Sequence, residues 1–256
     1  MGIIEVQEIS KAFSIPSVRR DTVREHLLGV LTPRRFERLQ VLDSISFEVE
    51  PGETVGIMGR NGSGKSTLLK IVCGIYPPDS GRVVTRGAVT PILELGVGWN
   101  TELDAIDNVF LIGSVMGLSL AEIRQSMDDI LAFAELERFA NLKLKFYSSG
   151  MSARLAYAVA FRAVRDVLVL DEIFAVGDAG FKARCQERYK QLHAQGHTVL
   201  IVSHDPFVIR SFCKRALLLE RGRIVVMGSA DTVVDRYVSM LTGGDAAAAH
   251  AVAHRS

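Results

Sequence analysis

A glycine-rich loop at residues 59–67 does most to constrain the fold of this 256-residue chain. It reads Gly59-Arg60-Asn61-Gly62-Ser63-Gly64-Lys65-Ser66-Thr67 and matches the phosphate-loop spacing G-x-x-x-x-G-K-[ST]. The apolar stretch at 53–58 predicts a strand before the loop, and the stretch at 66–73 predicts a helix after it. When a strand, a glycine loop and a helix follow one another, the backbone N–H groups of the loop and the helix N-terminus surround phosphate oxygens. The alternative to a phosphate loop is an ordinary glycine-rich turn, which would leave the flanking strand and helix unexplained.

Two side chains of the loop predict the chemistry of a nucleoside triphosphate site. We expect Lys65 to reach the β- and γ-phosphates, and the hydroxyl of Ser66 to bind Mg²⁺. The other loop residues are expected to bind phosphate oxygens, mainly through their backbone N–H groups. The sequence therefore predicts ATP and Mg²⁺ as ligands.

The charge of the chain argues against a nucleic-acid partner. The chain has 30 Lys and Arg residues and 29 Asp and Glu residues, which gives a formal net charge of +1. So small a charge creates no strong field toward DNA or an anionic bilayer. The first residues lack the pattern of a signal peptide, and no stretch approaches about 18 uninterrupted apolar residues. We therefore expect no nucleic-acid partner and no membrane-spanning segment.

Strand and helix patterns alternate along the chain, which predicts an α/β fold. The runs at 167–171 and 198–202 are almost continuously apolar, as is typical of strands buried on both faces of a mainly parallel sheet. A capping box at Ser119 and Glu122 predicts the start of a helix that continues to about Phe139. The other predicted strands are 3–9, 44–50, 82–93, 216–219 and 224–227, and the other predicted helices are 152–164 and 230–241.

Residues 14–40 interrupt this alternation with a basic amphipathic segment. Arginines alternate with apolar residues there, and Pro33 breaks the pattern. A solvated surface helix is one interpretation. The alternative is a helix at the cytoplasmic face of a membrane or against a membrane partner.

Polar residues at the ends of the buried strands predict the rest of the site. Asp171 ends one strand and is expected to hold Mg²⁺, while Glu172 is expected to polarise the attacking water. His204 follows the next strand, where an imidazole can contact the γ-phosphate. A second anion-binding cap is expected at Ser148, Ser149, Gly150 and Met151, which precede an alanine-rich helix.

In this order, these motifs resemble the ATP-binding subunit of an ABC transporter over residues 3–241. The resemblance implies a P-loop NTPase with a mainly parallel core sheet, a small antiparallel β lobe and a helical signature subdomain. It also implies one domain over residues 1–242, with the helical subdomain at about 95–165. We expect the tail at 243–256 to be disordered, although its alanines could support a short helix.

The resemblance assigns further roles by position. The segment 147–151 resembles the signature that caps ATP in a second copy, and Asp178 resembles the residue of the loop that crosses the dimer. Glu94 replaces the usual glutamine near Mg²⁺ and is an expected metal ligand beside Ser66 and Asp171. Phe13 is the candidate to stack on adenine, and a phenylalanine of the hydrophobic core is the alternative.

The chain departs from the common family pattern at three places, and in all three it resembles the ATPases that export lipid-linked polysaccharides. These are Glu94, the degenerate signature, and Ile173 where proline is usual after Glu172. The resemblance implies a homodimer on the cytoplasmic face of the inner membrane. It also implies a permease as partner, which would handle the lipid-linked glycan and dock on residues 95–118, with Trp99 as an expected anchor. A soluble ABC-type ATPase acting on DNA or ribosomes, an ABC importer subunit and a nucleotide kinase remain alternatives.

Overall fold

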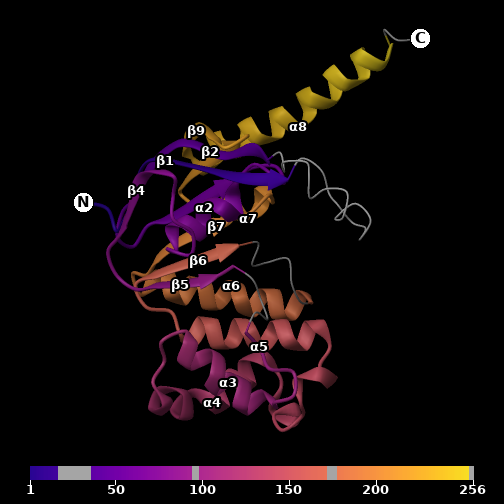
Figure 1. The fold of residues 1–256 in the computed structure, drawn as a ribbon. Helices are drawn as coiled ribbons and strands as arrows, with labels where there is room; N and C mark the ends of the chain where they lie inside the picture. Colours follow the sequence, from indigo (N-terminus) through magenta and orange to yellow (C-terminus); the bar gives the residue numbers. More distant parts are fainter. Residues whose placement is uncertain (17–35, 94–97, 172–177, 254–256) are drawn as a thin grey trace, which may run out of the picture.

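The computed structural model describes residues 1–16, 36–93, 98–171 and 178–253, with side chains described to residue 243. A six-stranded sheet in the order β5-β6-β7-β3-β8-β9 lies at its centre (Figure 1). Five strands run parallel, and β9 pairs antiparallel with β8. The bounds are β3 Thr54–Met58, β5 Val89–Ile92, β6 Val167–Asp171, β7 Thr198–Val202, β8 Arg215–Glu220 and β9 Arg223–Ser229. The prediction of a mainly parallel core sheet is confirmed.

The apolar runs of β6 and β7 bury side chains on both faces of this sheet. Leu168 and Leu170 of β6 belong to one hydrophobic cluster, which also contains side chains of α5 (Ser149–Arg162) and α6 (Ala179–Ala194). Val167 and Val169 point to the opposite face and join a cluster with α2 (Lys65–Val72). Successive strand residues alternate between faces, so a strand covered on both sides needs apolar residues throughout.

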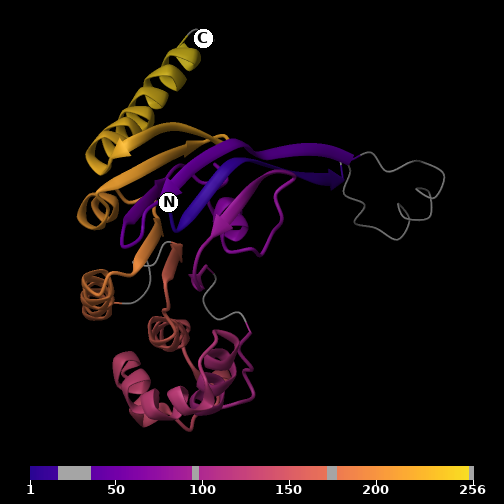
Figure 2. The ribbon, with the colours of Figure 1, turned by 90° about the vertical axis from the view of Figure 1, so that its left-hand side faces the viewer.

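A three-stranded antiparallel sheet in the order β2-β1-β4 packs on the α2 side of the core sheet. Its strands are β1 Ile4–Pro16, β2 Phe36–Val49 and β4 Ser80–Thr85. Both β1 and β2 are longer than predicted, and residues 14–16 and 36–40 of the expected helical insertion form a β-hairpin arm instead. The arm extends away from the body of the molecule (Figure 2). Residues 36–40 are exposed, so no alternation of buried and exposed residues marked them as a strand.

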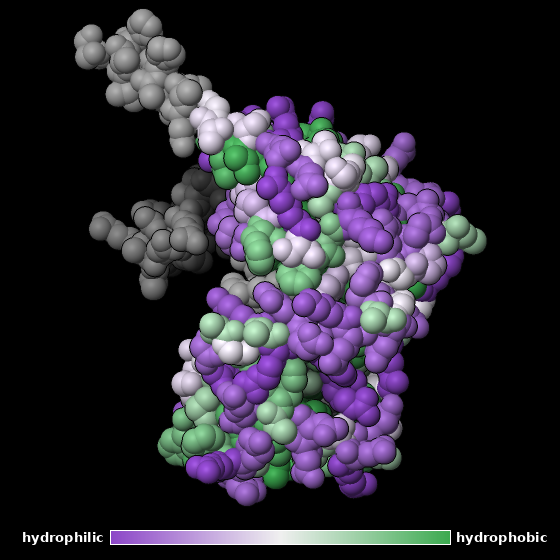
Figure 3. Space-filling view, turned by 180° about the vertical axis from the view of Figure 1, so that it is seen from behind, coloured by the Kyte–Doolittle hydropathy of each residue, from purple (hydrophilic) through white to green (hydrophobic). Residues whose placement is uncertain are grey.

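The helical subdomain has its own hydrophobic core and contains α3 (Ala105–Val115), α4 (Leu120–Ala134) and α5. The predicted capping box is confirmed, because Ser119 N–H donates to Glu122 Oε2 at 2.8 Å and Glu122 N–H donates to Ser119 Oγ at 3.2 Å. Helix α4 ends at Ala134, before the predicted Phe139, since Glu135 adopts a left-handed conformation with φ 58°. Exposed apolar residues gather on this subdomain (Figure 3), among them Val115 at 78% exposure.

The described residues also form two short 3₁₀ helices, Glu137–Phe139 and Leu144–Phe146, and three further α-helices. Helix α6 covers one face of the core sheet, and α7 (Pro206–Phe212) follows β7. Neither was among the predicted elements. The last helix, α8 (Ala230–Ala253), continues past residue 241 into the tail for which we expected disorder. Its alanines explain the difference, because alanine has the highest intrinsic helix propensity. Within the described part of the chain, no helix combines the length and apolar character needed to cross a membrane.

We expect Ile123→Ala to destabilise the protein by about 2–5 kcal/mol, because the lost side chain leaves a cavity in the helical core. Leu120 lies on the same helix but is 54% exposed. Leu120→Ala should therefore change the free energy of unfolding by less than about 0.5 kcal/mol. Urea denaturation followed by circular dichroism measures both values. Equal losses from the two variants would contradict the placement of α4 in the core.

Candidate functional site

The phosphate loop connects β3 to α2 and is held by close backbone approaches to two strands. A Cβ atom at Gly59 would lie 2.3 Å from the carbonyl oxygen of Leu219 on β8. A Cβ atom at Gly64 would lie 2.8 Å from the carbonyl oxygen of Val41 on β2, and Gly64 also has φ 106°. Only glycine fits both positions. The loop is therefore clamped between the core sheet and the antiparallel sheet.

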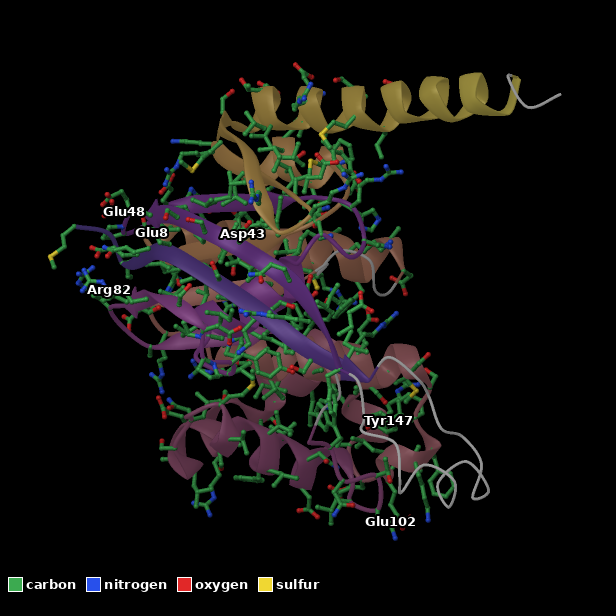
Figure 4. The ribbon with its side chains drawn as sticks, turned by 45° about the horizontal axis from the view of Figure 1, so that its top comes forward. Glu8, Asp43, Glu48, Arg82, Glu102 and Tyr147 are labelled. Atoms are coloured by element: carbon green, nitrogen blue, oxygen red, sulfur yellow. The ribbon has the colours of Figure 1, made fainter. Side chains whose placement is uncertain are left out.

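The turn between β8 and β9 completes this clamp. Gly222 N–H donates to the carbonyl oxygen of Ser63 at 3.0 Å, and Asp43 N–H donates to the carbonyl oxygen of Gly222 at 2.8 Å. Arg223 forms an ion pair with Asp43, which Figure 4 labels on β2. These contacts connect the phosphate loop to both sheets through one turn.

Lys65 and Ser63 place polar groups inside the loop. The Lys65 side chain is only 7% exposed, and its Nζ donates to the carbonyl oxygens of Gly59 at 2.8 Å and Arg60 at 3.0 Å. The Ser63 hydroxyl is buried and has no hydrogen-bond partner among the described residues. A buried ammonium and an unsatisfied hydroxyl in a glycine loop fit an anionic ligand with several acceptor oxygens.

Ser66 and Asp171 meet at the carboxyl edge of the core sheet. Ser66 Oγ donates to Asp171 Oδ2 at 3.0 Å, although 105 residues separate them in the chain. The parallel strands explain the meeting, since Asp171 of β6 pairs with Val202 of β7, and Val202 pairs with Ile57 of β3. Both groups offer oxygen ligands of the kind that Mg²⁺ prefers. His204 is exposed and lies two residues beyond β7, at the same edge.

Lys65, Ser66 and Asp171 line a cleft of about 640 Å³, a size typical of small-ligand sites, whereas His204 is not among its described lining residues. Its walls come from the phosphate loop, α2 and Asp171, and from Leu39 and Val41 of β2. Phe13 pairs with Leu39 across the hairpin, so the two side chains lie on the same face of the hairpin. Its ring packs edge-on against Tyr76 at 6.0 Å. Stacking of Phe13 on adenine stays a prediction.

The predicted signature forms the N-terminus of α5. The Ser148 side chain caps this helix by accepting from Met151 N–H at 3.2 Å. Ser149 is exposed, and a Cβ atom at Gly150 would meet open space apart from the Ser148 hydroxyl at 3.8 Å. None of the described residues that line the phosphate cleft comes from 147–151. Tyr147, labelled in Figure 4, lies in the helical subdomain and donates to the carbonyl oxygen of Phe139 at 2.7 Å.

Asp178 caps α6 and also forms an ion pair with Arg154, a residue that we did not predict as part of the site. Its Oδ1 accepts from Phe181 N–H at 2.9 Å, and this bond together with Arg154 lowers the pKa of the carboxyl group. Arg154 forms ion pairs with both Asp178 and Glu135. It therefore connects the signature helix to α6 and to the end of α4. A single arginine near the start of an alanine-rich helix was the available sequence signal.

Glu94 and Glu172 lie outside the described residues, so their assigned roles stay predictions. Trp99, an expected anchor for a permease, is half-buried and packs against the helical core.

Comparison with known proteins gives consistent matches. Residues 42–175, more than half of the chain, match the family described as ABC transporter. The chain is 43% identical over 240 residues to the ABC transporter protein AbcA of Aeromonas salmonicida, and this match covers 93% of the chain and 77% of the relative. It is 39% identical over 196 residues to the O-antigen export system ATP-binding protein RfbB of Klebsiella pneumoniae, covering 77% and 80%.

The fold is similar to that of solved ATP-binding cassettes. One is the dimeric, post-hydrolysis structure of the cassette MJ0796 bound to ADP and Pi. It superposes with a TM-score of 0.70 at 24% identity and covers 89% of this chain and 98% of that one. The predicted fold class is confirmed.

We expect Lys65→Ala to weaken nucleotide binding by about 10- to 100-fold, because a charged donor to phosphate contributes roughly 1.5–3 kcal/mol. Lys143→Ala is the matched control, since Lys143 is 51% exposed and pairs with Glu102 on the helical subdomain. Titration with a fluorescent ATP analogue measures both affinities. Unchanged affinity in the Lys65 variant would mean that the nucleotide binds elsewhere.

Proposed function

This chain belongs to the ABC transporter family as the ATPase subunit of a transporter, and we propose that it drives a membrane permease to export a lipid-linked polysaccharide. One observation carries the ATPase mechanism: Lys65, Ser66 and Asp171 line one cleft at the carboxyl edge of the core sheet. The choice of cargo is supported by the relative named as an O-antigen export ATP-binding protein. That relative favours export over the alternatives of a DNA- or ribosome-directed ATPase and an importer.

ATP binding in this cleft exchanges hydrogen bonds rather than creating a new pocket. Lys65 Nζ would leave the carbonyl oxygens of Gly59 and Arg60 and bond the β- and γ-phosphates. Ser66 and Asp171, with Glu94 as a proposed third ligand, would hold Mg²⁺. When bound, Mg²⁺ neutralises negative charge on the phosphate oxygens.

Hydrolysis in the same cleft is assigned to two residues at the sheet edge. Glu172 follows Asp171 directly and would accept the proton of the attacking water. His204, at the end of the neighbouring strand, would bond the γ-phosphate. Together they would activate the water and hold the group that it attacks.

Two copies are needed to complete the site. Within one chain, the described residues of the α5 N-terminus do not line the phosphate cleft. Ser149 and Gly150 at this helix end are nevertheless accessible from outside the molecule. A helix N-terminus with accessible N–H groups binds anions. In a head-to-tail homodimer, Ser149 and Gly150 of one copy would therefore cap the γ-phosphate held by Lys65 of the other. ATP then closes the dimer, and its hydrolysis opens the dimer.

The exposed apolar side chains of the helical subdomain are the proposed docking surface for the permease. Val115 is 78% exposed and Leu111 is 39% exposed, and both lie in the predicted docking segment 95–118. The basic segment at 14–40, part of which forms the hairpin arm, is the proposed contact with the membrane surface. We place the subunit at the cytoplasmic face of the inner membrane as a peripheral protein.

The function is tested by affinity purification of the Glu172→Gln variant from detergent-solubilised membranes in the presence of ATP. Removing the proposed base should lower hydrolysis by about 100-fold or more and keep ATP bound, so the closed dimer accumulates. We expect a polytopic permease in near-equal amount. Glu187→Gln, an exposed carboxylate on α6, is the control and should hydrolyse ATP at the normal rate. Recovery of ribosomes or DNA-repair proteins without a permease would contradict the export function.

The membrane role of the basic segment makes a separate prediction. Replacing residues 19–35, which hold five arginines and two acidic residues, by a short glycine-serine linker should reduce binding to vesicles with anionic lipid by at least about tenfold, since each net basic charge near the surface contributes roughly 1 kcal/mol. Nucleotide affinity should stay within about twofold. A variant with lysine in place of the arginines keeps the charge and should still bind. Co-flotation with anionic and neutral vesicles measures the effect, and unchanged flotation after the replacement would contradict it.

A further inference from the structure

A second cleft lies between α4, α5 and α6, and it shares no lining residue with the phosphate cleft. Its volume is about 480 Å³, which is large enough for a small organic ligand. The three helices that form it belong to the helical subdomain and to the layer that covers the core sheet (Figure 1). None of the roles described above uses this cleft.

One side of the cleft is apolar and aromatic. Ile130 of α4 is buried beside Phe133, and Phe161 of α5 is also buried. The rings of Phe133 and Phe161 meet edge to face, with their centroids 5.8 Å apart. These side chains offer a fixed apolar surface to an aromatic or aliphatic group.

The other side carries guanidinium groups that are not fully satisfied. Arg162 of α5 and Arg188 of α6 both line the cleft, and neither forms an ion pair with a carboxylate among the described residues. Arg188 Nη1 donates to Gln191 Oε1 at 3.2 Å. Burial lowers the pKa of Arg188 and the charge of Arg162 lowers it further, while Asp129 acts in the opposite direction. The two cations therefore repel each other, and Arg188 is half-buried while Arg162 is exposed.

With Arg184 paired to Glu135, the remaining charged side chains at the cleft are two arginines and two carboxylates. Arg184 also lines it, but this residue already pairs with Glu135 and lies over the ring of Phe181 at 5.8 Å. Asp129 and Glu187 are exposed at the cleft, but among the described residues neither forms an ion pair with Arg162 or Arg188. Arg162 and Arg188 are thus the groups that an incoming anion would engage.

We infer that this cleft binds a small organic anion, in which a phosphate or carboxylate bonds Arg162 and Arg188 and an apolar group lies against Phe133 and Phe161. Guanidinium groups match these anions with paired N–H donors. The anion would also offset the repulsion between the two cations. The site is distinct from the nucleotide site and does not depend on the proposed export function.

The test uses 1-naphthyl phosphate as the probe, with the full chain and with saturating ADP to fill the phosphate loop. Isothermal titration should show one additional saturable site in the wild-type protein. Arg162→Gln and Arg188→Gln should each weaken the probe by about tenfold, as expected for loss of a charged hydrogen-bond donor. Arg165→Gln is the matched control, because Arg165 pairs with Glu122 and does not line the cleft. It should change the affinity by less than about twofold.

Two further probes separate the parts of the inference. Inorganic phosphate lacks the apolar group and 1-naphthol lacks the anion, so both should bind at least about tenfold more weakly than the naphthyl ester. Nuclear Overhauser contacts between the naphthyl ring and Phe133 in the wild-type protein give the location without any substitution. No additional site, or an affinity that the two glutamine variants leave unchanged, would overturn the inference. Equal binding of inorganic phosphate would also overturn it.

Discussion

The close passage of the phosphate loop between two sheets is the constraint on which the site depends. At Gly59 and Gly64 the backbone leaves no room for a Cβ atom, because carbonyl oxygens of β8 and β2 would lie within 2.8 Å of it. The loop must therefore take one path, which directs its N–H groups and the start of α2 toward the cleft. The turn at Gly222 strengthens this arrangement by bonding both the loop and β2. A rigid, preorganised anion site follows from these contacts.

The same arrangement brings distant acidic residues to the loop. Parallel pairing of β6, β7 and β3 aligns their carboxyl ends, and this alignment places Asp171 within hydrogen-bond distance of Ser66. The helical subdomain folds around a separate core and presents the N-terminus of α5 away from the cleft. Arg154 connects that helix to Asp178, so the signature and the start of α6 are held together by ion pairs. A second copy can then use both elements as one unit.

The parts of the fold with strong local signals could be predicted from the sequence. The helix after the glycine loop, the capping box at Ser119 and the strands β6 and β7 follow from strong local patterns, and the structure confirms these elements. The sequence does not predict the hairpin arm, because its residues belong to the basic segment 14–40 that suggests a helix, and residues 36–40 are exposed on both faces of the strand. The ion pairs of Arg154 and the cleft lined by Arg162 and Arg188 could not be predicted either. Both join residues from different helices, and tertiary packing decides which helices lie side by side. The roles assigned to the site residues, among them Lys65, Glu172 and His204, stay predictions.

If ATP joins the phosphate loop of one copy to the signature of another, cross-linking between these two segments in different chains must depend on ATP. One preparation carries Asn61→Cys and a second carries Ser149→Cys, both exposed positions, each in a Cys73→Ser and Glu172→Gln background. After mixing, we predict cross-linked heterodimers with ATP and few with ADP. Cross-linking that is equal with both nucleotides, or absent with ATP, would contradict a shared site.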